Sequence, residues 1–188
     1  MIETQLLAPA SNDTLFELMA GFKIIDALVR EGFREHFELI EGGPTPFGRL
    51  LGPLELTIWW QRSIWRLLGH REDSRYRQAL LASRMPLGAL RPDFVIMSSS
   101  PRRIPMVEVK QMTVDKAKPE RRGLREAMAY LDDANSLLSI LPGPHALVIG
   151  WNATASPGLS RVVVTNQDEI GDAVRLVANE WVPQARTK

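Results

Sequence analysis

Apolar positions recur at helical spacing in three stretches of this chain. Residues 13–31 place Leu18, Phe22 and Ile25 on one face of a helix, and Gly32 provides a stop signal. The same spacing predicts two further helices, a long one over residues 119–140, which Pro142 ends, and a closing amphipathic one over residues 168–181. Helices are therefore expected near the start, in the middle and at the end of the chain.

Strands are predicted where short apolar or β-branched runs lie between turn signals. These runs cover residues 36–42, 54–61, 92–97, 104–112, 145–151 and 161–166. The Pro- and Gly-rich residues 43–53 predict a loop, and the pattern from Arg62 to Leu90 is weak. The runs "FVIM" and "ALVIG" are apolar without alternation, which is typical of strands covered on both faces. The order of elements therefore predicts an α/β fold, in which a central mixed sheet is flanked by helices.

Length and composition fit a single domain over residues 1–188, with 45% hydrophobic and 24% charged residues. The chain has no cysteine, which excludes disulfides, thiolate metal sites and cysteine nucleophiles and favours a reducing compartment. The first residues lack a signal-peptide pattern, and no apolar run is long enough to span a membrane. We therefore expect a cytoplasmic protein without membrane contact.

Basic residues gather in one third of the chain, although the net charge is only +1. From Arg62 to Arg125 there are 15 Lys or Arg against 6 Asp or Glu, whereas the remainder has 8 against 16. Such segregation can present a positive face to a polyanion, and a solvated basic surface without a ligand is the alternative. The arginines expected to follow a nucleic-acid backbone are Arg71, Arg75, Arg77, Arg121, Arg122 and Arg125.

Three charges interrupt the predicted strands over residues 92–97 and 104–112. Asp93 begins the first strand, and the i, i+2 spacing of Glu108 and Lys110 puts both on one face of the second. A hairpin can bring the two carboxylates together, where they repel unless a cation lies between them. Mg²⁺ is commonly held by one or two carboxylates plus substrate phosphate, and an ammonium can hold the attacking water and offset charge on the phosphate. The pattern therefore predicts a phosphodiester hydrolysis site that uses Mg²⁺, for which Mn²⁺ can substitute.

The stretch "RPDFVIM…MVEVKQM" resembles the PD-(D/E)XK motif of the restriction-endonuclease-like nuclease superfamily. Pro92-Asp93 is similar to its first part and Glu108-Val109-Lys110 to its second, with an ordinary separation of 15 residues between the two acids. The resemblance implies a core with the order α, three strands, α, strand. It also implies cleavage of nucleic acid, most readily DNA, with Asp93, Glu108 and Lys110 as the catalytic residues.

The resemblance extends beyond the motif. Glu17 is similar to a glutamate that the first helix of the superfamily often adds to the metal site, which implies Glu17, Asp93 and Glu108 as metal ligands. Glu126 and Tyr130 have the spacing of the Gln-x-x-x-Tyr pattern of recombination exonucleases, with Glu in place of Gln, and would support the active site. The order of a helix glutamate, "WWQRS", "RPD" and "EVK" also resembles nuclease domains of modification-dependent restriction subunits, which belong to larger defence assemblies.

Each of these residues also has an ordinary structural interpretation. A Glu-x-Lys pair can lie on a solvent-facing strand, Glu17 can pair with Lys23, Glu126 can form an i, i+4 pair with Arg122, and Tyr130 can pack in the core. For the whole protein, the alternative is an inactive nuclease-like module that binds nucleic acid or acts as a scaffold. No P-loop, HExxH motif or nucleophile elbow occurs, so other hydrolase mechanisms are not supported.

No separate module for reading base sequence is visible outside the predicted nuclease core. Sequence readout normally needs a helix or ribbon that enters the major groove with several base contacts. We therefore expect the activity to be directed by a partner subunit or a fused motor or recognition module of a prokaryotic defence or repair system. Self-association into a homodimer that cuts two strands is the other expected arrangement.

Overall fold

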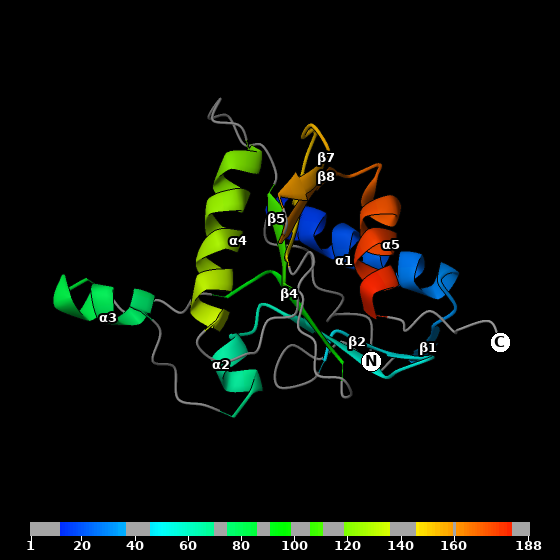
Figure 1. Cartoon of the computed structure of the whole chain (residues 1–188), viewed down its shortest axis with the longest axis horizontal. Helices are drawn as coiled ribbons and strands as arrows, with labels where there is room; N and C mark the ends of the chain where they lie inside the picture. The colour runs from blue at the N-terminus through cyan, green and yellow to red at the C-terminus, as the bar shows by residue number, and fades with distance from the viewer. Residues whose placement is uncertain are drawn as a thin grey trace, which may run out of the picture.

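The computed structural model describes residues 12–36, 46–69, 75–85, 91–98, 106–110, 119–135, 146–159 and 161–181. Within these residues the strands form one eight-stranded mixed sheet, with helices on both of its faces (Figure 1). The predicted α/β class, with a mixed sheet between helices, is confirmed. No helix among the described residues combines the length and the apolar character that crossing a membrane requires.

The strands lie in the order β1-β2-β3-β4-β5-β6-β8-β7. They are β1 (Arg34–His36), β2 (Gly48–Leu51), β3 (Leu56–Trp60), β4 (Phe94–Ser98), β5 (Met106–Lys110), β6 (Ala146–Gly150), β7 (Ser156–Leu159) and β8 (Val162–Asn166). The helices are α1 (Asn12–Arg30), α2 (Ile64–Leu67), α3 (Arg75–Ala82), α4 (Pro119–Asn135) and α5 (Ile170–Trp181). Neighbouring strands are antiparallel from β1 to β5, whereas β6 is parallel to β5, β8 is parallel to β6, and β7 is antiparallel to β8.

The parallel pair β5–β6 determines where α4 lies. Parallel neighbours need a long crossover connection, and α4 is the helix of this crossover. All five residues of β6 are buried, as are four of the five in β4, which confirms the prediction that "ALVIG" and "FVIM" are covered on both faces. The central strands are therefore shielded from solvent by helices on either side.

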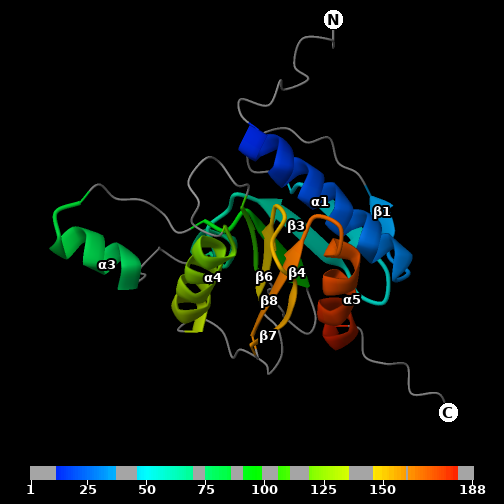
Figure 2. The same ribbon diagram turned by 90° about the horizontal axis from the view of Figure 1, so that it is seen from above.

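Two apolar layers cover the two faces of the sheet, and Figure 2 shows α4 on one side of the strands and α1 and α5 on the other. On one face α1 and α5 pack over a layer that includes Val107 and Val109 of β5. On the other face α4 packs over a layer that includes Met106 of β5 and Val148 of β6. Because side chains alternate along a strand, Glu108 and Lys110 share the α4 side with Met106.

Helix α1 ends as the sequence predicts. Gly32 adopts a positive φ of 96°, and the N–H of Phe33 returns to the carbonyl of Leu28 at 3.2 Å, a common way of terminating a helix. The helix buries Phe16 and Ile24 against the sheet. The polar positions of α1, Glu17 among them, therefore lie at the edge of the face that packs on the sheet.

Several predictions of local structure were wrong. The loop predicted over residues 43–53 contains β2, because Leu50 is needed in the core and both neighbouring strands pair with this segment. Strand β1 begins at Arg34, earlier than predicted, and residues 37–42 of the predicted strand lie outside the described residues. Strand β7 was not predicted, and α2 and α3 occupy the stretch with a weak pattern.

Two glycines allow helices to approach the sheet closely. A Cβ on Gly21 of α1 would lie 2.6 Å from the Phe94 ring and 2.9 Å from the Phe47 ring. A Cβ on Gly123 of α4 would lie 2.6 Å from Cγ1 of Val148 and 3.4 Å from Cγ of Lys110. Larger residues would separate these helices from the strands below them.

The Gly123→Ala substitution should therefore destabilise the protein by about 1–3 kcal/mol, because overpacking outweighs the better helix propensity of alanine. The matched control is Gly171→Ala in α5, where a new Cβ meets nothing within 4 Å. We expect Gly171→Ala to be neutral or slightly stabilising. Urea unfolding of both variants checks the prediction, and equal stability of the two would contradict the close contact at Gly123.

Candidate active site

Asp93 lies where the β4–β5 ladder ends. The paired residues are Val95 with Met106 and Phe94 with Val107, so one further step would place Asp93 opposite Glu108. Instead, Oδ2 of Asp93 accepts a hydrogen bond from the backbone N–H of Val109 at 2.6 Å. The carboxylate thus replaces a backbone partner of the ladder and is fixed beside β5.

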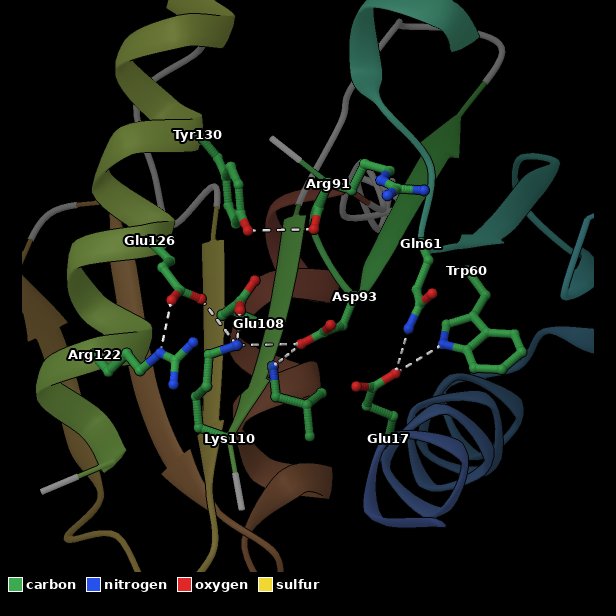
Figure 3. A network of polar contacts seen from close by, with 11 residues as sticks. Glu17, Trp60, Gln61, Arg91, Asp93, Glu108, Lys110, Arg122, Glu126 and Tyr130 are labelled. Atoms are coloured by element: carbon green, nitrogen blue, oxygen red, sulfur yellow. Dashed lines mark hydrogen bonds and ion pairs between the residues drawn. The ribbon is translucent and has the colours of Figure 1, made fainter. Parts of the chain in front are cut away.

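Lys110 joins the acids on the α4 side of the sheet (Figure 3). Its Nζ contacts the Glu108 carboxylate directly, lies 2.9 Å from Oε2 of Glu126 and lies 3.9 Å from Oδ2 of Asp93. Glu108 is only 2% exposed and Asp93 8%. The structure therefore brings together Asp93, Glu108 and Lys110, as their spacing predicts.

The two buried acids resist ionisation. Burial, only partly offset by Lys110, raises the pKa of Asp93 to about 7, and the charge of Glu17 adds to this rise. Burial, together with Glu126 and Asp93, raises the pKa of Glu108 to about 9. Although burial opposes its charge, the adjacent Glu108 and Asp93 raise the pKa of Lys110 above its ordinary value. One ammonium is thus insufficient to keep this buried cluster fully ionised.

Glu126 of α4 completes the cluster from above the sheet. It bonds Lys110 and also accepts from Nε of Arg122 at 2.9 Å. Burial works against its charge, but Glu108, Lys110 and Arg122 together lower the pKa of Glu126 to about 2. Oε2 of Glu108 is buried and accepts no hydrogen bond from the described residues. A protonated Glu108 can instead donate to Glu126, which is consistent with the opposite shifts of the two pKa values.

Tyr130 lies one turn after Glu126 on the same face of α4. Its hydroxyl donates to the backbone carbonyl of Arg91 at 3.2 Å, and the side chain is buried. Burial and the nearby carboxylates raise the pKa of Tyr130 above its ordinary value, so it remains a hydrogen-bond donor. The helix thereby holds the segment that leads into Asp93.

Glu17 approaches from α1. Its Oε2 accepts hydrogen bonds from Nε1 of Trp60 at 3.1 Å and from Nε2 of Gln61 at 2.9 Å. The predicted ligand set of Glu17, Asp93 and Glu108 is not gathered in this arrangement: in the described part of the chain, no three Asp, Glu, His or Cys side chains converge closely enough to hold a metal ion. Glu17 nevertheless lies near enough for its charge to raise the pKa of Asp93.

The acidic pair itself fits a hard divalent cation. Mg²⁺ prefers carboxylate oxygens and commonly uses only one or two protein carboxylates, with water and phosphate completing its coordination. Asp93 and Glu108 offer such oxygens, and Oε2 of Glu108 lacks a donor among the described residues. Their raised pKa values indicate that a cation at this position would relieve repulsion and desolvation.

The predicted backbone-binding arginines are only partly placed. Arg121 and Arg125 are exposed on α4, and Arg122 pairs with Glu126 close to the acidic cluster. Arg77, on α3, is partly buried and has a partner of its own. Arg71 and the side chain of Arg75 lie outside the described residues. Of these six predicted arginines, Arg122 is therefore the one whose described contacts place it beside the acidic cluster.

Sequence reasoning missed the roles of Gln61 and of the Arg91 carbonyl. Gln61 directly follows β3, and the sequence contains no sign that its backbone turns there or that its amide reaches α1. The Arg91 carbonyl could not have been identified, because backbone groups are the same at every position. No protein-family model matches this chain, and a comparison with curated proteins finds no match.

Proposed function

We propose that this protein is a metal-dependent nuclease that hydrolyses phosphodiester bonds, with DNA as the favoured substrate. The observation that carries the proposal is the buried cluster of Asp93, Glu108 and Lys110 at the end of the β4–β5 ladder. The hydrogen bond to Val109 accounts for a polar side chain at Asp93, but not for Glu108 as a second buried acid with a raised pKa, since an apolar residue would fill the Glu108 position at lower cost. The two carboxylates of this cluster suit a bound cation, and its ammonium suits a phosphate.

The order of elements supports a restriction-endonuclease-like core. Apart from β1 and β2 before β3, and α2 and α3 between β3 and β4, helix α1, strands β3, β4 and β5, helix α4 and strand β6 follow the order α, three strands, α, strand that the resemblance implies. The acids lie on β5 and just before β4, beside the crossover helix. This agreement concerns the arrangement of the chain and is independent of the pKa shifts.

In this proposal, Asp93 and Glu108 hold Mg²⁺ or Mn²⁺. When bound, the ion supplies Lewis acidity toward a phosphate oxygen and positive charge between the acids. Lys110 is anchored by Glu126, so its ammonium can hold the attacking water and offset charge that develops on the phosphate. Tyr130 holds the backbone before Asp93, and Arg121 and Arg125 are available to backbone phosphates.

We also propose that the cleavage activity is directed by another module. The described elements are used by the sheet and by the helices that cover it, apart from α3, which extends away from the sheet in both views (Figures 1 and 2). A partner subunit, a fused motor or a second copy of the chain would supply target choice. A place in a prokaryotic defence or repair system and a cytoplasmic location fit this arrangement.

A second candidate is a nuclease-like module that binds nucleic acid without cutting it. The observation in its favour is that Lys110 already contacts Asp93, Glu108 and Glu126, so that the cluster is partly neutralised without a metal. The protein would then only bind nucleic acid, through its arginines, and would not cut it. Its affinity would fall with salt by about 0.9 logarithmic units per phosphate contact for each tenfold rise in salt concentration.

The two candidates are separated by incubating the purified chain with supercoiled plasmid. The nuclease should produce nicked plasmid with Mg²⁺ or Mn²⁺ and none with a chelator, and cutting should be slow without a directing module. A Lys110→Met preparation purified identically controls for contaminating nucleases. Salt-dependent binding without metal-dependent nicking would instead favour the binding module and overturn the nuclease proposal.

A further inference from the structure

Gln61 adopts a backbone conformation that is unusual for its type. Its φ is 48°, in the left-handed region that costs a non-glycine residue on the order of 1 kcal/mol or more. The position follows the last residue of β3, and the Gln61 N–H donates to the backbone carbonyl of Asp93 at 2.8 Å. The strained backbone is therefore attached directly to one of the candidate catalytic residues.

The conformation also changes the direction of the Gln61 side chain. In a regular strand, Trp60 and Gln61 would point to opposite faces of the sheet. Here both donate to the same atom, Oε2 of Glu17 (Figure 3). The left-handed turn thus allows two consecutive side chains to hold one carboxylate of α1.

This arrangement leaves the other oxygen of Glu17 available. Both of these hydrogen bonds go to Oε2, and Oε1 lies on the Asp93 side of the carboxylate in Figure 3. Both donors are neutral groups, an indole and an amide, so they fix the carboxylate without adding a counter-charge. A cation or an ordered water near Asp93 would meet an oriented and uncompensated carboxylate oxygen.

We infer that Gln61 is a positioning residue, which with Trp60 holds Glu17 through Oε2 so that Oε1 faces the Asp93–Glu108 pair. Glu17 then acts on the bound metal, directly or through a coordinated water, as the third acidic group of the site. The inference rests on the proposed metal-dependent function. It accounts for a strained residue at this position, because in the left-handed turn the Gln61 amide reaches Glu17 while the Gln61 N–H donates to Asp93.

The test compares Gln61→Gly with the wild-type protein. Glycine accepts the left-handed backbone, so the fold should be kept or slightly stabilised, but the donor to Glu17 is lost. We expect Mn²⁺ affinity, measured by calorimetry, to fall by roughly 10-fold, as when a group that supports a metal site is removed. Glu17→Gln should weaken binding by a similar factor, and the double variant should be little worse than either single one.

The matched control is Asn152→Gly. Asn152 is another non-glycine residue with a positive φ, 53°, and its hydrogen bonds within the described part of the chain go to Gln167. Asn152→Gly should leave Mn²⁺ affinity unchanged. A metal-independent readout is the indole N–H resonance of Trp60, assigned with Trp60→Phe, which should shift in both Glu17→Gln and Gln61→Gly.

The possible results separate the inference from the proposed function. If the wild-type protein binds Mn²⁺ but Gln61→Gly binds it equally well, the positioning role is wrong and the nuclease proposal stands. If the wild-type protein binds no Mn²⁺ or Mg²⁺, the proposed function fails and the inference fails with it. Weaker binding by Gln61→Gly together with unchanged or increased stability supports both, because a purely structural residue would not separate these two properties.

Discussion

Replacing Asp93 with asparagine should reduce metal-dependent cleavage by roughly 10²–10⁴-fold, the range that a single positioned charged or acid–base group contributes. Asparagine retains a side-chain oxygen that can accept the Val109 N–H, so the end of the ladder should persist. The charge that would hold a cation is lost. Initial rates of plasmid nicking measure the effect, and DNA binding measured by fluorescence anisotropy should be nearly unchanged.

Companion substitutions refine this expectation. Glu108→Gln and Lys110→Met should lower the rate similarly, whereas Asp93→Ala should in addition destabilise the fold by about 1–3 kcal/mol, because it leaves a buried N–H without a partner. Asp26→Asn is the control, since Asp26 forms an exposed ion pair with Arg30 on α1. Wild-type cutting rates in Asp93→Asn would exclude Asp93 from the chemistry.

Without divalent cations, the stability of the folded protein should fall as the pH rises from about 5 to about 9. The folded-state pKa values of Asp93 and Glu108, about 7 and about 9, lie above their ordinary values of 3.8 and 4.5. At a pH between the ordinary and the raised pKa of each acid, that acid has lost its proton in the unfolded chain but keeps it in the folded chain. Each acid can then lower the free energy of unfolding by at most about 1.4 kcal/mol per pH unit. Both acids contribute up to about pH 7, and Glu108 alone above it.

Other members of the cluster limit the range of this effect. The lowered pKa of Glu126, about 2, adds stability that is present above its ordinary value of 4.5 and is lost as the pH falls toward 2. The raised pKa of Lys110 adds stability that is present below its ordinary value of 10.5 and is lost only above it. The metal-free protein should therefore be most stable in mildly acidic solution.

Urea unfolding in chelator at about pH 5.5, 7 and 8.5 measures this dependence. Glu108→Gln should flatten the decrease, because its side chain cannot ionise. Excess Mg²⁺ at about pH 8.5 should restore much of the lost stability, since a ligand that binds only the folded state stabilises it. A stability that does not vary with pH in the wild-type protein would show that the two acids are not destabilised by burial.

The sequence predicted those parts of the molecule that depend on local periodicity. The helical spacing in α1 and the uninterrupted apolar runs of β4 and β6 correspond to observed elements. Strand β2 was missed because proline and glycine dominate the composition around it, although its partner β3 follows closely in the chain. Tertiary contacts determine such a strand more than its own composition does.

The same distinction applies to the site. The meeting of Asp93, Glu108 and Lys110 follows from strand alternation and from one hairpin, so sequence spacing was sufficient to predict it. The contact of Glu126 with Lys110 depends on how closely α4 approaches the sheet at Gly123. The role of Gln61 depends on a single backbone angle, which a glutamine in the sequence does not reveal.

The close approach at Gly21 links the hydrophobic core to the spacing of the acids. Gly21 lies four residues after Glu17, about one helical turn or 6 Å along α1, and the Phe94 ring that it contacts directly follows Asp93 in the chain. The tip of the Phe94 ring, which lies against Gly21, therefore limits how closely this part of α1, and with it Glu17, can approach Asp93. In the proposed metal site, a change in the size of an apolar side chain here, with no change of charge, should therefore alter the distance between Glu17 and Asp93 and with it the preferred metal ion.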